Sequence, residues 1–137
     1  MSYKFFTIVA VLALTFSTIV IADEPTYIDP LDSLDNKGEM MVWVNIAAQE
    51  YGVKPKFMKC LIRHENRAWN PELQSLVVSN GKREDSWGLS QIHLPSHPSI
   101  TREEATDPKF AIEFMASEIS EGNAWQWSTL KYCKHLQ

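Results

Sequence analysis

The sequence predicts a single small domain that is mainly α-helical, and three observations lead to this prediction. Apolar residues recur at intervals of three and four in several segments, as they do on one face of a helix. No segment shows a convincing alternation of apolar and polar residues, although Leu76-Val77-Val78 could form a small strand. The 137 residues leave room for one domain, because a leader and a linker take up part of the chain.

The first segment, residues 1–22, is predicted to be a signal peptide or an N-terminal anchor. Lys4 precedes an almost purely apolar run, which ends in Val20-Ile21-Ala22 as a signal-peptidase site requires. The run is also about long enough to span a bilayer, so an uncleaved anchor is the alternative, and only then is a membrane an expected partner. Residues 23–37 are predicted to be a linker, and residues 38–137 form the domain. The protein is therefore expected to be exported, to the periplasm, the cell envelope or the medium.

The chain has two cysteines, Cys60 and Cys133. In an exported protein an even number of cysteines is more often bridged than reduced, so a disulfide is expected here. Closing so long a loop would stabilise the fold by about 4 kcal/mol in the chain-entropy model. Two reduced, buried thiols are the alternative, because the sequence alone does not bring the two residues together.

Charge and composition limit the class of ligand. The formal net charge is −4, and loss of the leader with its single lysine makes it more negative. This argues against nucleic acid as a partner. The five tryptophans fit a carbohydrate, whose apolar ring faces stack on aromatic side chains, although a tryptophan taken singly is more often part of the core. A monomer is expected.

Two amphipathic helices are predicted in the first half of the domain. The first has Gly52 as its C-terminal cap. Its apolar residues are Met40, Val44, Ala47, Ala48 and Tyr51. The second begins near Pro55, a residue that suits the first helical position. Its apolar residues are Phe57, Met58, Leu61 and Ile62. Glu65 continues this stripe, so a carboxylate is predicted on the inward face of a helix, close to its C-terminal end.

The second half begins with loop signals over residues 70–100, within which Trp87 to Ile92 forms a short apolar segment that could start a helix. Thr101 to Glu104 predicts a capping box. Asp107-Pro108 predicts the start of a longer helix, with Gly122 as its C-terminal cap. Its apolar residues are Phe110, Ala111, Ile112, Phe114, Met115 and Ile119.

The predicted position of Glu65 has chemical consequences. Burial and the negative end of a helix both disfavour the charged carboxylate, so both raise its pKa. A carboxylic acid that keeps its proton near neutral pH can protonate the leaving oxygen of a glycosidic bond. The alternative is an ordinary helical charge, paired with Arg63, His64 or Arg67.

Three segments occur in an order that favours the first interpretation: Glu65-Asn66-Arg67-Ala68-Trp69-Asn70-Pro71, then Ser75, then Ser86-Trp87-Gly88-Leu89-Ser90-Gln91-Ile92. In this order they resemble the soluble lytic transglycosylase family of the lysozyme-like fold. Downstream, Ala105-Thr106-Asp107-Pro108 and the helix that follows are similar to the family's helix after its Asp/Asn-Pro. The resemblance spans roughly residues 40–133. It implies a lysozyme-like fold and cleavage of the MurNAc–GlcNAc β-1,4 bond in the glycan strands of peptidoglycan, with no cofactor expected.

The resemblance also implies roles for individual residues. Glu65 corresponds to the family's catalytic acid, and Gln91 to a residue at the floor of the sugar cleft. Ser75 and Ser86 are expected near the substrate, and Tyr132 takes the place of a tyrosine that hydrogen-bonds the catalytic glutamate.

Three departures from the family's pattern accompany these matches. Asn66 stands where serine is usual, and Ser90 replaces methionine. The late Ala-Tyr-Asn-x-Gly motif is reduced to Lys131-Tyr132-Cys133. Cys133 in place of the asparagine suggests that a disulfide now fixes this end of the chain.

The mechanism depends on how many acids attend the scissile bond. The resemblance implies a transglycosylase, in which one glutamate acts as acid and then as base while a substrate hydroxyl closes a 1,6-anhydro ring. A hydrolysing lysozyme normally has a second carboxylate, for which Asp85 is the best candidate in the sequence. A solvated loop acid next to Arg83 and Glu84 is the alternative for Asp85, and aspartate is usually exposed. A non-catalytic glycan-binding wall protein is the third alternative.

The histidines do not predict a metal site. His64-Glu65 lacks the second histidine of a zinc-binding helix, and Pro95 between His93 and His97 prevents helical ligation. Two further side chains near the C-terminus, Trp125 and Trp127, alternate with a polar residue, so one is expected to be buried and the other exposed.

Overall fold

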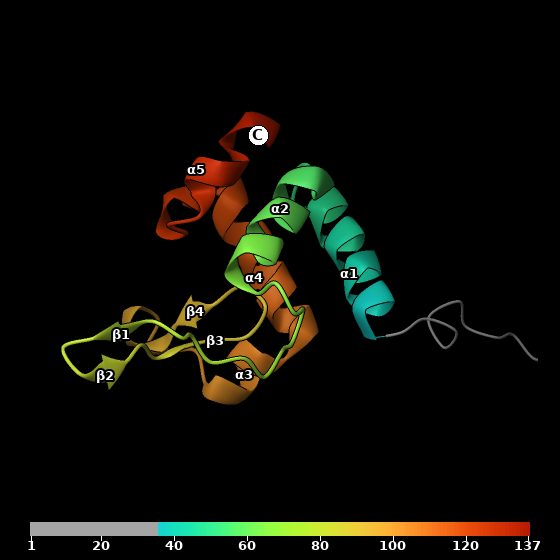
Figure 1. Ribbon diagram of the computed structural model, residues 1–137. Coiled ribbons are helices and arrows are strands. Elements are labelled where there is room, and N and C mark those ends of the chain that lie inside the picture. The colour runs from blue at the N-terminus through green and yellow to red at the C-terminus, as the bar shows by residue number, and fades with distance from the viewer. Residues whose placement is uncertain (1–35) are drawn as a thin grey trace, which may run out of the picture.

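The computed structural model describes residues 36–137, which form a mainly α-helical domain with two short hairpins (Figure 1). The predicted leader and nearly all of the predicted linker lie outside these residues. The first helix, α1 (Asn36–Glu50), begins inside the range predicted to be linker. Within the described residues, no helix combines the length and the apolar composition that a bilayer span requires.

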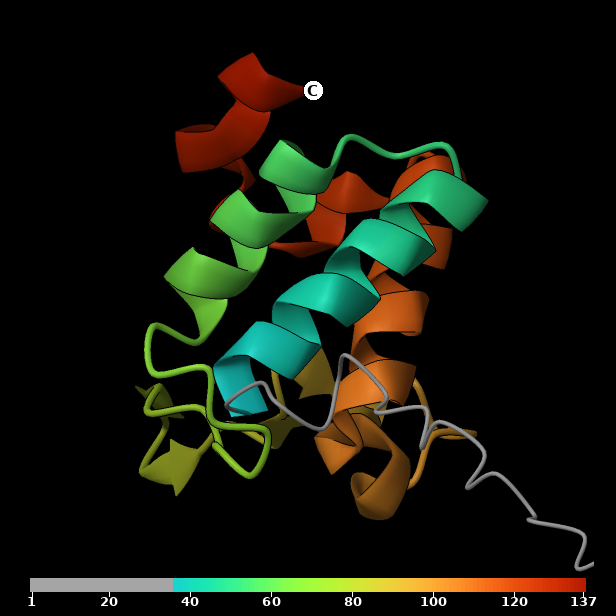
Figure 2. The ribbon, with the colours of Figure 1, turned by 90° about the vertical axis from the view of Figure 1, so that its right-hand side faces the viewer.

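Three helices enclose the core: α1, α2 (Pro55–Glu65) and α4 (Pro108–Ser120). Helix α1 packs against both others, and Figure 2 shows it running beside α4. The predicted stripes of α1 and α2 are confirmed, with one exception. Their buried members are Met40, Val44, Ala47 and Ala48 in α1 and Phe57, Met58, Leu61 and Ile62 in α2. Tyr51, predicted to belong to the α1 stripe, follows the end of that helix and is only partly buried against the core.

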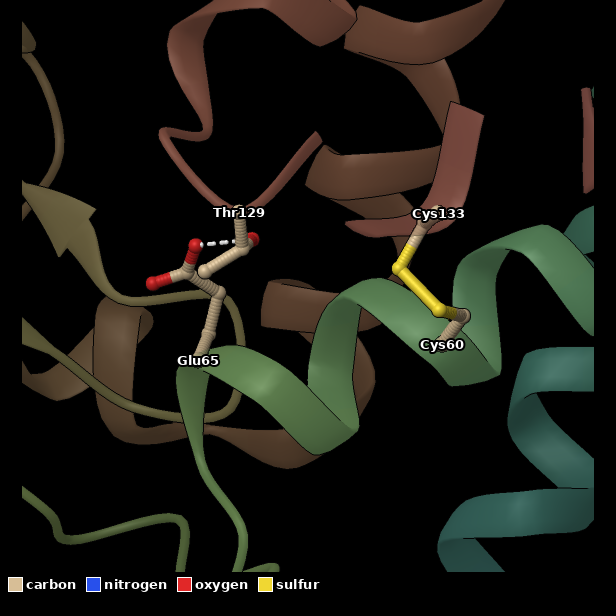
Figure 3. The surroundings of a disulfide bond; sticks show 4 residues. All are labelled: Cys60, Glu65, Thr129 and Cys133. Carbon is tan, nitrogen blue, oxygen red and sulfur yellow. Dashed lines mark hydrogen bonds between the residues drawn. A yellow bond between two sulfur atoms is a disulfide. The ribbon is translucent and has the colours of Figure 1, made fainter. Parts of the chain in front are cut away.

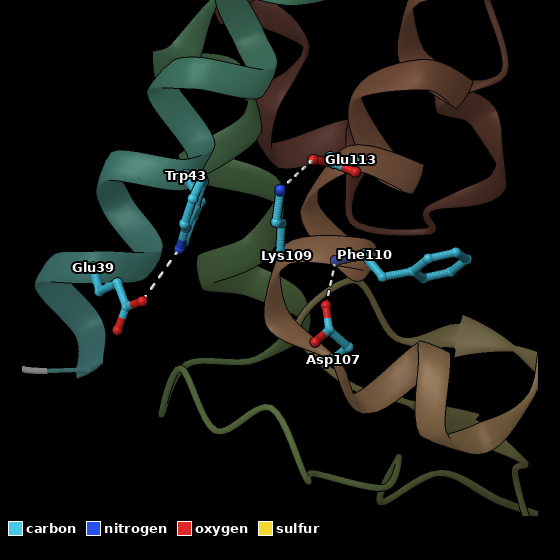
Figure 4. Close-up of polar contacts among 6 residues, drawn as sticks. All are labelled: Glu39, Trp43, Asp107, Lys109, Phe110 and Glu113. Atoms are coloured by element: carbon cyan, nitrogen blue, oxygen red, sulfur yellow. Dashed lines mark hydrogen bonds and ion pairs between the residues drawn. The ribbon is translucent and has the colours of Figure 1, made fainter. Parts of the chain in front are cut away.

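Side-chain caps define where the later helices begin, as predicted. Thr101 forms a complete capping box with Glu104 at the start of α3 (Arg102–Thr106). Asp107 caps α4, because its Oδ1 accepts a hydrogen bond of 2.7 Å from the amide of Phe110 (Figure 4). These contacts satisfy amide groups that have no partner inside the helix.

Aromatic and charged side chains also join α1 to α4 at the surface. Lys109 of α4 pairs with Glu113 at 3.8 Å, and its ammonium group lies 5.0 Å from the centre of the Trp43 ring (Figure 4). The indole of Trp43 donates to Glu39 of the same helix at 3.4 Å. A cation over an indole contributes about 0.5–1 kcal/mol at an exposed site, so this cluster supplements the apolar contacts beneath it.

The first hairpin pairs β1 (Val78–Ser79) with β2 (Lys82–Arg83) around Asn80-Gly81. Both turn residues have positive φ, 51° and 74°, as a tight two-residue hairpin turn requires. The small strand expected at Leu76-Val77-Val78 therefore starts only at Val78 and continues to Ser79.

The second hairpin corrects a prediction. Trp87 to Ile92 does not start a helix; it contributes to β3 (Ser86–Trp87) and β4 (Ile92–His93) and the turn between them. Gly88 and Gln91 both adopt left-handed φ values, 80° and 50°, which a right-handed helix excludes. The two hairpins lie together at one end of the molecule, beside α3 (Figure 1).

The chain ends in short helices that fold back onto α2. After β4 comes η2 (Leu94–Ser96), and after α4 come η3 (Ala124–Gln126), α5 (Leu130–Cys133) and η4 (Lys134–Leu136). The expected disulfide is confirmed: Cys60 of α2 is bonded to Cys133 of α5, with their Cα atoms 5.8 Å apart. The alternation expected near this end is confirmed as well, because Trp127 is 6% exposed and Trp125 is 72% exposed.

Candidate active site

A cleft of about 1140 Å³ is lined by the C-terminal end of α2 and by the segment that precedes α5. The two hairpins form one side of it, and the segment around η3 forms the other. Its titratable lining residues are His64, Glu65, Arg67, Glu84, His93 and His97. The predicted site residues Glu65, Ser75, Ser86 and Gln91 all line this cleft.

Glu65 is the last residue of α2 and is half-buried in the cleft. Its Oε1 accepts a hydrogen bond of 2.5 Å from Oγ1 of Thr129, the residue before α5 (Figure 3). The predicted alternative was an ion pair with a basic neighbour. The only ion pair found in residues 36–137 joins Lys109 to Glu113, so Glu65 has no such partner there.

The surroundings raise the pKa of Glu65, and the main cause is the burial of its carboxyl group. The hydroxyl and the backbone amide of Thr129 hydrogen-bond the carboxylate and act in the opposite direction. The negative charge of Glu84 raises the pKa further, and His64 lowers it. The result is an acid that retains its proton to higher pH than a solvated glutamate, as the sequence predicted.

The turn after Glu65 is held by a side chain whose role the sequence did not reveal. Asn66 is completely buried, and its Nδ2 donates to the carbonyl oxygens of Asn70 (2.6 Å) and Gly88 (3.1 Å). Its Oδ1 accepts from the amide of Asn70 at 3.0 Å. Asn66 therefore joins the end of α2 to the second hairpin, which serine, with its single hydroxyl, would do with fewer hydrogen bonds.

Gln91 is held in the cleft by two backbone carbonyls. Its Nε2 donates to Leu73 at 3.1 Å and to Gly88 at 2.9 Å. The backbone of Gly88 approaches α3 so closely that a Cβ atom would lie 1.8 Å from the carbonyl oxygen of Ala105. The glycine is needed here both for its left-handed φ and for this contact.

Asp85, the acid that the sequence favoured as a second carboxylate, does not line the cleft. It is exposed, and its Oδ1 accepts a hydrogen bond of 2.7 Å from the indole of Trp87. The neighbouring Glu84 lines the cleft instead. Successive side chains of an extended chain point to opposite sides, so Glu84 and Ser86 share a side that Asp85 does not. The Asn80-Gly81 pair, which is typical of a two-residue hairpin turn, is the sequence signal that could have predicted an extended chain and this alternation.

Tyr132 is also outside the lining of the cleft. It is 52% exposed, and its ring stacks on His64 with the centroids 4.9 Å apart. Thr129 occupies the position beside the Glu65 carboxyl group that was expected for this tyrosine. The contact of Thr129 with Glu65 could not be predicted from the sequence, because only the fold of the C-terminal segment brings these two residues together.

Exposed apolar side chains line both sides of the cleft. Leu76 and Val77 are 77% and 58% exposed on the hairpin side, and Trp125 is exposed on the opposite side. Surfaces of this kind suit the apolar faces and N-acetyl methyl groups of amino sugars.

One group of possible metal ligands occurs within residues 36–137, formed by Cys60, His64 and Cys133. Both sulfur atoms belong to the disulfide, so neither is available as a thiolate ligand. His93 contacts the hydroxyl of Ser96 at 2.7 Å, and His97 contacts the side-chain oxygen of Gln126 at 3.2 Å.

No family model matches this chain, and no curated protein or solved structure matches it. The function of the cleft is therefore inferred from the residues that line it and from their geometry.

Proposed function

We propose that this protein is a lysozyme-like enzyme that cleaves the MurNAc–GlcNAc β-1,4 bond of peptidoglycan, as a lytic transglycosylase with Glu65 as its acid and base. The observation that carries the proposal is a half-buried glutamate without an ion pair in residues 36–137, placed in a large cleft. The sequence motifs around Glu65 and Gln91, which resemble those of the soluble lytic transglycosylase family, support the same proposal.

In this mechanism Glu65 begins in its protonated form, which its raised pKa favours. The carboxyl proton passes to the glycosidic oxygen while the bond from that oxygen to C1 of MurNAc breaks. The ionised Glu65 then takes the proton of the C6 hydroxyl as O6 bonds to C1. The products are a 1,6-anhydro-MurNAc end and a free GlcNAc 4-hydroxyl, and Glu65 is protonated again.

The dimensions of the cleft support a polymeric ligand. Its volume of about 1140 Å³ exceeds what one sugar ring needs. Leu76 and Val77 on one side and Trp125 on the other offer apolar contacts to successive sugars. Gln91, whose amide nitrogen bonds two backbone carbonyls, offers its side-chain oxygen to the cleft.

Hydrolysis is a second candidate, because a second carboxylate, that of Glu84, lies in the cleft. In that reaction water replaces the C6 hydroxyl as the group that attacks C1, and the product is a reducing sugar. Export of the protein is part of the proposal in both cases, since the disulfide indicates an oxidising compartment.

The direct test is digestion of purified sacculi, followed by mass analysis of the released muropeptides. A transglycosylase gives anhydro ends, a hydrolase gives reducing ends, and a glycan-binding protein leaves the sacculi undigested with protein bound. Glu65→Gln should abolish cleavage and leave the folded structure intact. Full activity of that variant would show that Glu65 is not the acid.

A further inference from the structure

We propose that Glu84 is a second functional carboxylate of this cleft, and that its negative charge stabilises the positive charge that develops on the sugar as Glu65 protonates the leaving oxygen. This inference rests on the proposed glycosidase function. It gives to Glu84 the role of second carboxylate, for which the sequence indicated only Asp85. The role is the same whether a substrate hydroxyl or water then attacks C1.

Hydrogen bonds fix the position of Glu84. Its amide donates to the carbonyl of Val77 at 2.8 Å, and its own carbonyl accepts from Nε2 of Gln74 at 3.2 Å. Its side-chain Oε2 accepts from the hydroxyl of Ser75 at 2.7 Å. That hydroxyl also accepts a hydrogen bond from the amide of Val77, at 3.2 Å. The carboxylate is therefore held at a defined place in the wall of the cleft.

The charge of Glu84 is not neutralised by an ion pair within residues 36–137. The adjacent Arg83 is engaged elsewhere, since its Nε donates to the carbonyl of Ser75 at 2.5 Å and its Nη2 to that of Gln74 at 3.0 Å. Because the guanidinium hydrogen-bonds these backbone carbonyls, it forms no ion pair with the neighbouring carboxylate. Such a fixed charge is suited to a cationic transition state, because it needs no reorganisation during the reaction.

Glu84 and Glu65 also affect each other across the cleft. The negative charge of Glu84 raises the pKa of Glu65, and thereby favours the protonated form that the first step requires. His64, the other titratable neighbour with an effect, lowers this pKa. The remaining titratable groups of the lining are Arg67, His93 and His97. Glu84 thus has two effects with one charge: it adds to the burial that raises the pKa of Glu65 before the reaction, and it stabilises the sugar cation during the reaction.

The decisive comparison is Glu84→Gln with Asp85→Asn. Each change removes one negative charge, and the two residues are adjacent in the chain, but only Glu84 lines the cleft. The amide oxygen of glutamine can still accept the Ser75 hydrogen bond, so the hairpin should keep its structure. Glu84→Gln should lower kcat by about 100-fold or more, the usual effect of removing one preorganised electrostatic group, with a much smaller change in KM. Asp85→Asn should retain kcat within about twofold, as surface substitutions usually do.

The pH profile separates an electrostatic role from a structural one. Glu65 acts as a protonated acid, so activity falls as the pH rises through its pKa. Removing the charge of Glu84 lowers that pKa, so the basic limb of the kcat/KM profile should move to lower pH. Glu84→Asp keeps the charge and should return the limb towards its position in the unaltered protein.

A measurement without substrate keeps this inference distinct from the proposed function. Carboxyl carbon NMR of the full-length protein, labelled at glutamate, reports the titration of Glu65 directly. The pKa of Glu65 should be lower in Glu84→Gln than in the unaltered protein, and unchanged in Asp85→Asn. If the unaltered protein cleaves sacculi but Glu84→Gln keeps its kcat, its pH profile and the pKa of Glu65, the role of Glu84 is refuted. If the unaltered protein does not cleave, the proposed function fails, and the assignment of Glu84 to its mechanism fails with it, whatever the NMR titration shows.

Discussion

Removal of the disulfide between Cys60 and Cys133 tests how this small domain is stabilised. The bond closes a loop with a sequence separation of 73 residues. In the chain-entropy model a loop of that length contributes about 4 kcal/mol, which is a large part of the 5–15 kcal/mol that is typical of the total stability of a domain. Cys60→Ala/Cys133→Ala is the suitable variant, because Cys133 is completely buried and alanine introduces no polar group there.

The assay is urea unfolding followed by circular dichroism. With an m value of about 1–3 kcal/mol/M for a small domain, a loss of about 4 kcal/mol lowers the midpoint by roughly 1–4 M. The reduced form of the unaltered protein is the matched control, because it keeps both sulfur atoms and lacks only the bond. A difference between the reduced protein and the alanine variant would measure the packing of the sulfur atoms.

Loss of the disulfide should also affect the candidate active site. The disulfide joins α2 to α5, and Thr129, directly before α5, hydrogen-bonds Glu65 at the end of α2 (Figure 3). Without the bond, hydrogen exchange should accelerate first in α5, since local opening follows the weakest attachment. A midpoint that changes by less than the equivalent of about 1 kcal/mol in both the reduced and the alanine forms would refute the entropic argument.

Two further predictions concern single contacts at the site. Thr129→Val removes the hydroxyl that stabilises the ionised form of Glu65, so the pKa of Glu65 should rise. The basic limb of the pH profile of activity should then move to higher pH. A basic limb at an unchanged pH would contradict this role of Thr129. Gly88→Ala should destabilise the protein by about 3 kcal/mol or more, because its Cβ would lie 1.8 Å from the Ala105 carbonyl oxygen in addition to the strain of a positive φ. Gly81→Ala is the control, and the stability of both variants is measured by urea unfolding. At Gly81 φ is also positive, 74°, but a Cβ would meet no atom within 4 Å. An equal loss of stability in both variants would rule out the contact with Ala105 as the cause.

Much of the helical framework could be predicted from the sequence, because a helix is specified by residues close together in the chain. The spacing of Phe57, Leu61 and Glu65 placed a carboxylate on the inner face of α2, and the structure has it there, half-buried. The caps at Thr101 and Asp107 were predicted for the same reason, since each uses a side chain and an amide three residues apart.

The opposite side of the cleft depends on contacts between distant residues. Trp87 to Ile92 has the composition of a helix start, but the close approach of Gly88 to Ala105 and the pairing of β3 with β4 make it a hairpin. Two adjacent acids, Glu84 and Asp85, lie on opposite sides of the extended chain between β2 and β3. The register of this segment decides which of them lines the cleft, because a shift of one residue would exchange their sides.

The sequence by itself therefore predicted a half-buried carboxylate at Glu65, the helix that carries it and the direction of its pKa shift. Only the tertiary structure decided which groups surround that acid. Thr129 reaches Glu65 from 64 positions further along the chain, and Glu84, directly after the first hairpin, reaches the same cleft. The local spacing of apolar residues predicts whether a side chain is buried. Its neighbours across a cleft depend instead on contacts between distant segments, here on the packing of α5 and on the disulfide that joins α5 to α2.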